Sequence, residues 1–351
     1  MRSNKIHNSD LFTQAANEHF QKHLKTQSKQ ALMIIDKKID WSKLIAPLEK
    51  RLAYDKANLS PAGRKPHDLV VIVKCFILQT IYGLSDPRLE EEIADRRSFQ
   101  MFLGLNSNDS IPDETTICRY RELFARLGLD KLLFKSFNRQ LSHQGLIIGK
   151  GTIVDATLKQ AQATPRSNRD TDATFTKRGN KTTYGYKGHI GVDDKTTIIH
   201  SLEFTPAHIH DSEKFDDLIM GTERVILADK GYANRERKKM LKDQGIRYGI
   251  MDKGYRDRPL TKKQKERNKS LSCIRNAVER PFSFMKLVLN YQRCRYYDLI
   301  RNRMQFILCA VVFNMRRMLS LTVGIRTWYT WRSIGLAFDG WSNDKEQLMT
   351  L

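Results

Sequence analysis

Three acidic residues in the sequence are placed so that their carboxylates could meet at one metal site. Asp155 lies inside an apolar, strand-like run, where an aspartate is disfavoured unless it has a specific role. Asp229 directly follows a second apolar run, at the expected carboxyl end of a strand, and Glu279 lies on a later helical segment. Open α/β sheets bind ligands at the carboxyl ends of their strands. This order predicts that Asp155, Asp229 and Glu279 are catalytic metal ligands.

Basic residues accompany these acids at regular spacings. Arg275 precedes Glu279 by one helical turn and Lys286 follows it by two turns, so the three side chains would share one face of a helix. The bases would pair with the acid or hold phosphates; a salt-bridged solvent face is the alternative. Lys187 and His189 occupy alternate strand positions and could both point toward the site, although a histidine there is often structural. We expect Lys187, Arg275 and Lys286 to contact DNA.

Carboxylates are the ligands that suit hard divalent cations. Mg²⁺ prefers oxygen ligands and keeps several waters, so a few carboxylates are enough to hold it. Two such ions, about 4 Å apart, activate the attacking oxygen and stabilise the leaving one in displacement at phosphorus. The sequence therefore predicts two Mg²⁺ ions, with Mn²⁺ as an alternative. His208, His210 and Asp211 resemble a further metal cluster, but Asp211 precedes a helical run and is more simply an N-cap.

The composition favours a polyanionic partner. The chain has 351 residues, and 61 Lys+Arg against 39 Asp+Glu give a formal net charge of +22 and a pI near 9.8. Such a charge attracts nucleic acid, with acidic membrane or ribosomal RNA as the alternatives. The five cysteines form no Cys-x-x-Cys pair and indicate a reducing cytoplasm. The apolar run 306–313 is too short to span a bilayer, so we expect a core helix and no membrane partner.

The order of local patterns predicts an α/β fold preceded by helices. Residues 1–40 are polar, residues 41–149 have helical patterns, and residues 150–321 alternate strand-like and helical stretches. The helical part is either a DNA-binding module or a cap on a catalytic domain. Strands are expected at 151–158, 184–193, 196–204, 225–229 and 246–250, with helices at 211–220 and 235–244 and a long helix carrying Glu279. The basic segments 159–183 and 251–270 flank the expected site, and we interpret them as DNA-contacting loops.

An ordered set of short motifs resembles one protein family. The chain is similar, from about residue 41 to 321, to bacterial insertion-sequence transposases of the DDE class, insertion-sequence-five group. The matching stretches are Tyr82-Gly83-Leu84-Ser85-Asp86-Pro87, Ile111-Pro112-Asp113-Glu114-Thr115-Thr116, Ile153-Val154-Asp155-Ala156-Thr157, Gly185-Tyr186-Lys187-Gly188-His189-Ile190-Gly191-Val192-Asp193, Ala228-Asp229-Lys230-Gly231-Tyr232, and Val278-Glu279-Arg280-Pro281-Phe282 followed by Lys286.

The resemblance implies a ribonuclease-H-like catalytic domain with a central mixed sheet, preceded by an all-helical N-terminal domain. It implies that Asp155, Asp229 and Glu279 bind two Mg²⁺ ions, that the ends of an element are nicked, and that the freed 3′-hydroxyl is joined to target DNA. The expected partners are the terminal inverted repeats and target DNA, bound by a homodimer at the bacterial nucleoid in the cytoplasm.

Two parts of the chain depart from the family pattern. The Tyr-x-x-Arg-x-x-x-Glu signature has Ser272 at the tyrosine position, which removes a stacking or phosphate contact. Residues 322–351 form a tail to which we assign no role. A nuclease that nicks without joining, and a DNA-binding protein that has lost its chemistry, are the alternative functions; the presence of all three acids disfavours the second.

Overall fold

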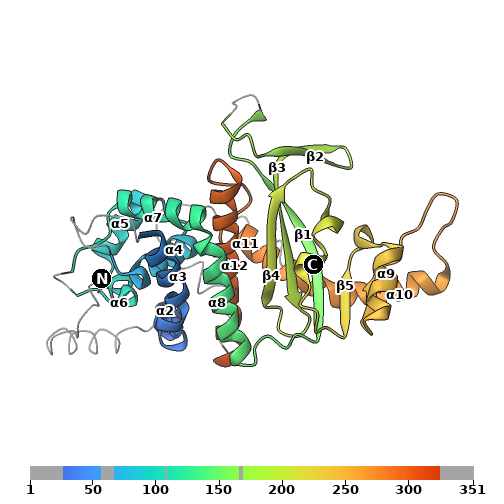
Figure 1. The fold of residues 1–351 in the computed structure, drawn as a ribbon, viewed down its shortest axis with the longest axis horizontal. Coiled ribbons are helices and arrows are strands. Elements are labelled where there is room, and N and C mark those ends of the chain that lie inside the picture. Colours follow the sequence, from blue (N-terminus) through green and yellow to red (C-terminus); the bar gives the residue numbers. More distant parts are fainter. Residues whose placement is uncertain (1–26, 57–66, 107–108, 166–168, 325–351) are drawn as a thin grey trace, which may run out of the picture.

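The structure, a computed structural model, describes residues 27–56, 67–106, 109–165 and 169–324, and consists of a helical region beside a mixed β-sheet (Figure 1). The order of elements predicted from local patterns is confirmed: helices come first and the sheet follows. The helical region contains α2 (Gln27–Lys38), α3 (Trp41–Lys56), α4 (Leu69–Tyr82), α5 (Asp86–Asp95), α6 (Arg97–Leu103), α7 (Glu114–Leu127) and α8 (Leu129–His143). Helix α2 lies within the segment described as polar, and its Ala31, Leu32 and Ile35 side chains are buried.

Capping residues fix where these helices begin and end. The Asp68 side chain accepts from the Val70 N–H at the start of α4, and Gly83 closes that helix with a φ of 69°. Asp113 caps α7 in the same way by accepting from Thr116. Helices α5 and α6 are separate because Arg96, which lies between them, adopts an extended backbone conformation.

The sheet has the strand order of a ribonuclease-H-like fold. Its strands are β1 (Gly151–Gln160), β2 (Thr174–Arg178), β3 (Lys181–Asp193), β4 (Ile199–Pro206), β5 (Val225–Ala228) and β6 (Arg247–Ile250). Strands β1, β5 and β6 are parallel neighbours, whereas β3 is antiparallel to β1 and pairs with β4 on its other side. The resulting order β4-β3-β1-β5-β6, with helices before and after it, confirms the predicted fold class.

Strand β2 was not expected from the sequence. It forms a hairpin with the first part of β3, inside the basic segment that we interpreted as a loop. The helix expected at 211–220 is instead a pair of short 3₁₀ helices, η2 (Asp211–Lys214) and η3 (Asp216–Leu218). Helix α9 (Arg235–Asp243) has the expected position, and α10 (Lys262–Arg275) begins inside the second basic segment.

The last helix of the described chain, α12 (Leu299–Thr322), lies between the helical region and the sheet (Figure 1). It packs against α4, α7 and α8 on one side and β4 on the other, so a single apolar core runs through both regions. By length and composition α12 could cross a bilayer, but 72% of its most apolar window is buried inside the protein. The apolar run 306–313 is therefore part of a core helix.

A buried amide network joins this helix to the sheet. Asn314 of α12 accepts from the Ile199 N–H at 2.9 Å and donates to the Ile199 carbonyl at 2.7 Å. It also donates to Asn138 of α8 at 3.0 Å. Both asparagines are buried, and buried polar groups need such partners to be tolerated. The network sets the position of the helical region relative to the strands.

Candidate active site

Asp155 and Asp229 lie side by side at the point where the parallel pairing of strands β1 and β5 ends. In the β1–β5 pairing Val154 is opposite Ala228, and the two aspartates are the next residues along each chain. Strand β5 ends there, whereas β1 continues to Gln160. Asp155 pairs with Ile190 of β3, and the preceding Val154 pairs with Ala228 of β5, so the backbone position of Asp155 is fixed.

The Asp155 carboxylate is mostly buried and is held by two donors. Its Oδ2 accepts from Arg275 Nη1 at 3.0 Å, and its Oδ1 accepts from the Ala156 N–H at 2.9 Å. Burial raises the pKa of Asp155, and the negative charges of Asp229 and Asp211 raise it further, against the lowering effect of Ala156 and Arg275. Negative charge is therefore concentrated around this carboxylate, as a site for a cation requires.

Asp229 also defines a backbone turn. Its side chain accepts from the Lys230 N–H at 2.7 Å and caps the 3₁₀ helix η4 (Lys230–Tyr232). Asp229 therefore has a structural role as the cap of this turn. One carboxylate oxygen makes this bond, and the group stands beside Asp155, so a structural role and metal ligation are compatible.

Glu279 is placed by a break in its helix. Helix α10 ends at Arg275, the 3₁₀ helix η5 (Asn276–Val278) follows, and α11 (Glu279–Leu287) begins at the acid itself. The expected single helix is thus interrupted. Val278 is fully buried and η5 packs against β1, whereas the Glu279 side chain is exposed. Residues one helical turn apart have Cβ atoms about 5–6 Å from each other, so Glu279 starts close to Arg275 and its bond with Asp155.

Asp155, Asp229 and Glu279 do not form one metal-binding cluster in the structure. Within the described ranges, no three His, Cys, Asp or Glu side chains are gathered closely enough to hold a metal ion. The donor chemistry of the first two acids nevertheless fits a hard divalent cation, because two carboxylates meet at adjacent strand ends in a partly desolvated, negatively charged environment. Ligation by Glu279 would require its exposed side chain to turn toward them.

Lys187 and His189 lie on the other face of the sheet from the Asp155 side chain. Residues opposed in an antiparallel pair share a face and neighbours along a strand alternate; Asp155 is opposite Ile190, so positions 187 and 189 face the other way. Lys187 donates to the Ile209 carbonyl at 2.8 Å and pairs with Asp211 at 3.0 Å. His189 is fully buried against Thr205, and burial lowers its pKa to about 4, so it is neutral and structural.

Asp211 is a charged neighbour of the site that the sequence did not identify. Its charge raises the pKa of Asp155, while its carboxylate pairs with Lys187. The expectation that Asp211 caps a helix is wrong, because His210 is the capping residue and accepts from the Ser212 N–H at 3.2 Å. The sequence shows only a run of polar residues after β4, and this run does not reveal that the chain returns toward β1 and brings Asp211 near Asp155.

The remaining predicted positions lie at the edge of this region. Lys286 is exposed in the last turn of α11. The pKa of the buried Lys159 is lowered to about 8, first by desolvation and then by the charge of Lys286, whereas the nearby thiols of Cys309 and Cys294 raise it. Ser272 lies on α10 one turn before Arg275 and is partly exposed. A DNA contact by Arg275, Lys187 or Lys286 remains a prediction.

The strand order and the paired aspartates define a ribonuclease-H-like domain, and comparison with known families gives its class. Residues 149–315 match the family model described as Transposase DDE domain, and residues 19–123 match the model Transposase domain (DUF772). Both matches are to transposase domains, and the one that covers the sheet is to the DDE class. A cryo-EM structure of the piggyBac transposase synaptic complex with hairpin DNA is similar with 11% identity, covering 90% of this chain and 88% of that chain, at a TM-score of 0.39.

Proposed function

We propose that this protein is a bacterial insertion-sequence transposase of the insertion-sequence-five group. It nicks DNA at the ends of its element and joins the 3′-hydroxyl ends to target DNA. The observation that supports this most is the pair Asp155 and Asp229 at adjacent strand ends, inside the segment that matches a Transposase DDE domain. The net charge of +22 suits a DNA substrate. Its place of action would be the nucleoid in the bacterial cytoplasm.

In the proposed mechanism, each residue of the site has one task. Asp155 and Asp229, with Glu279 turned inward, would hold two Mg²⁺ ions, or Mn²⁺ in their place. When bound, such ions supply Lewis-acid stabilisation of the attacking and leaving oxygens at phosphorus. Arg275 lies beside Asp155 and would orient a phosphate of the scissile strand. Lys286, exposed on α11, would hold a phosphate further along the strand.

Lys187 would contribute to DNA positioning only if its pair with Asp211 opened. Joining two element ends requires two active sites acting together, so we propose a homodimer on DNA. The helical region before β1 would then recognise the terminal inverted repeats. This assignment is supported by the match of residues 19–123 to a transposase domain and by the shared core that connects the region to the sheet.

The test is strand cleavage and joining by the purified protein. DNA carrying the element end is incubated with Mg²⁺ and plasmid target, for wild type and for Glu279→Gln. We expect nicked and joined products from wild type and neither product from the variant. Undiminished cleavage by Glu279→Gln would refute its role as a metal ligand. Cleavage by wild type with no joining, even from pre-cleaved ends, would identify a nuclease instead.

A further inference from the structure

The β2–β3 hairpin projects beyond the rest of the sheet (Figure 1). Its strands pair from Thr174 opposite Gly185 to Arg178 opposite Lys181, so a two-residue turn closes it. Within the described chain, residues 181–184 of β3 pair with β2 alone. Pairing of β3 with β1 starts at Gly185, and its pairing with β4 starts at Tyr186. The hairpin is therefore a free two-stranded ribbon, of the size that the major groove of DNA admits.

The surface of this ribbon is basic and carries an exposed aromatic ring. Lys177 and Lys181 are both exposed, and within the described chain neither ammonium group is paired with a carboxylate. Phe175 is 55% exposed and packs on Tyr184 with ring centroids 5.0 Å apart. Unpaired lysines are complementary to phosphates, and an exposed ring beside them adds apolar contact with sugars or base edges.

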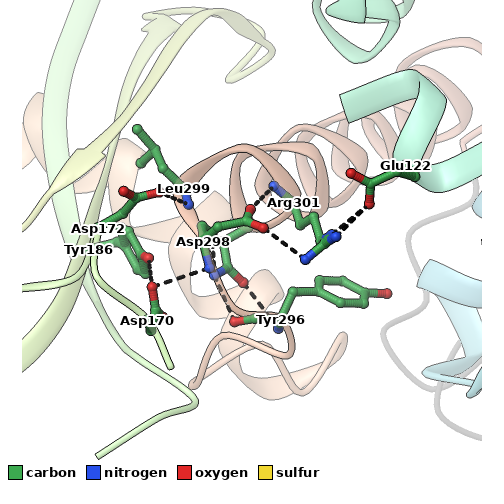
Figure 2. Close-up of polar contacts among 9 residues, drawn as sticks. Glu122, Asp170, Asp172, Tyr186, Tyr296, Asp298, Leu299 and Arg301 are labelled. Atoms are coloured by element: carbon green, nitrogen blue, oxygen red, sulfur yellow. Dashed lines mark hydrogen bonds and ion pairs between the residues drawn. The ribbon is translucent and has the colours of Figure 1, made fainter. Parts of the chain in front are cut away.

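The base of the hairpin is bonded to the first turn of α12 (Figure 2). Asp170, which is 2% exposed, accepts from the Tyr186 hydroxyl and from the Asp298 N–H at 3.2 Å. The Tyr184 hydroxyl donates to the Asp170 carbonyl at 2.6 Å, and the Asp172 carboxylate accepts from the Leu299 N–H at 2.8 Å. The segment that leads into β2 is thus held on α12.

A further link extends from the same turn to the helical region. Arg301 pairs with Asp298 at 2.9 Å and with Glu122 of α7 at 2.7 Å (Figure 2). Several directed bonds therefore connect the hairpin base, α12 and α7. A ribbon mounted in this way keeps a fixed distance and orientation relative to the strands that carry the acids.

The pairing registers give that distance and orientation. Tyr184 and Thr182 are an even number of residues from Ile190, so they share the sheet face of the Asp155 side chain, as do their opposite residues Phe175 and Lys177. Lys181 is nine residues from Ile190, which is opposite Asp155. At about 3.4 Å per residue the tip is at most about 30 Å from Asp155. This equals about nine base pairs at about 3.4 Å each.

We propose that the β2–β3 hairpin is a duplex-binding arm that contacts DNA within about nine base pairs of the scissile phosphate. The inference rests on the proposed function, because it takes the DNA to lie across the acids. It adds a defined contact region near the tip, in which Phe175 and Lys177 lie on one face of the ribbon and Lys181 lies on the other, and an upper limit on its distance from the site of chemistry. The occupant is duplex DNA, chosen for its charge complementarity with the unpaired lysines.

The first test measures affinity against salt for the full-length protein. The probe is a labelled duplex carrying one element end, taken from the DNA that flanks the gene. The double variant Lys177→Ala, Lys181→Ala should lower the slope of log affinity against log salt by about two, since each lost phosphate contact removes about 0.9. Lys195→Ala is the control, because Lys195 is exposed at the opposite end of β3, and its slope should match wild type. Thermal melting confirms that the variants are folded.

The second test locates the contact by hydroxyl-radical footprinting on the same duplex, with the wild-type cleavage position mapped in parallel. Backbone protection that extends up to about nine base pairs from the cleaved phosphate should be present in wild type and shortened in the double variant. If wild type cleaves the duplex but the double variant keeps the same footprint and slope as the control, the arm is refuted and the proposed function stands. If wild type neither binds nor cleaves the duplex, both proposals fail.

Discussion

Arg275 on α10 donates to Asp155 on β1, with 3.0 Å between Nη1 and Oδ2, although 120 residues separate them in sequence. Only 16% of the Arg275 side chain and 23% of the Asp155 side chain are exposed, so the pair is largely removed from water. The Arg275 guanidinium offsets the negative charge of Asp155, to which the nearby carboxylates of Asp229 and Asp211 add. The same contact brings the start of α11, and with it Glu279, next to the sheet.

Removing Arg275 should destabilise the protein. In Arg275→Ala the Asp155 carboxylate would keep its burial but lose its cation, and we expect a loss of about 2 kcal/mol in the free energy of unfolding. Urea denaturation measures the difference. Arg280→Ala is the control, since Arg280 is exposed on the next helix and its loss should change stability by less than about 0.5 kcal/mol. Equal stability of the two variants would show that the pair contributes nothing.

Asp229→Asn should separate chemistry from folding. Asparagine can still accept from the Lys230 N–H and cap η4, so the melting temperature should change little. The lost anionic ligand should reduce DNA cleavage by at least about a hundred-fold, equivalent to about 3 kcal/mol in the barrier. Asp243→Asn, at the exposed end of α9, should cleave normally. A cleavage rate near wild type for Asp229→Asn contradicts its assignment.

Asp193 should make stability depend on pH. Burial alone would raise the pKa of Asp193, but the N–H groups of Thr196, Gly149, Lys195 and Ile148 donate to the carboxylate and lower its pKa overall. A lowered folded pKa means that the ionised group stabilises the fold above about pH 4, and that this contribution is lost as the pH falls through the folded pKa.

We therefore expect Asp193→Asn to cost about 2 kcal/mol at pH 7, with the gap from wild type narrowing below about pH 4. Urea denaturation across this pH range provides the measurement. A gap that is constant with pH would mean that the charge of Asp193 is unimportant. Because the carboxylate holds residues 148 and 149 just before β1, the variant also tests how that strand is positioned.

The hairpin anchor predicts a local change in dynamics. Asp170→Ala leaves the buried Tyr186 hydroxyl and the Asp298 N–H without their acceptor, so amide hydrogen exchange in residues 174–184 should accelerate. Asp172→Ala removes one bond at an exposed position and should have a smaller effect. Hydrogen exchange measured by mass spectrometry distinguishes the two. Unchanged exchange in both variants would mean that the anchor does not order the hairpin.

Local patterns in the sequence predicted the strands that carry the acids. Apolar runs around Asp155 and before Asp229 predicted β1 and β5, because such runs are typical of buried parallel strands. The burial of residues 306–313 in a core helix followed from their apolar composition. These features depend on residues close together in the chain, which a single sequence can reveal.

Contacts between segments that are distant in the sequence could not be predicted from local patterns. Helical periodicity placed Arg275 and Glu279 on one face, but the 3₁₀ break at Asn276–Val278 and the Arg275–Asp155 bond depend on how α10 packs on the sheet. The polar composition of residues 174–178 concealed β2, which is ordered by pairing with β3. Lys187 was correctly placed on a strand, but the face of the sheet on which its side chain lies depends on the β1–β3 register.

The most direct test of the central claim is a crystal structure of the protein bound to element-end DNA and Mn²⁺, with anomalous scattering used to locate the metal. The account predicts two manganese peaks about 4 Å apart, ligated by Asp155 and Asp229, with Glu279 turned in from the start of α11. Manganese bound elsewhere, with Asp155 and Asp229 making no contact to it in the DNA complex, would contradict the account.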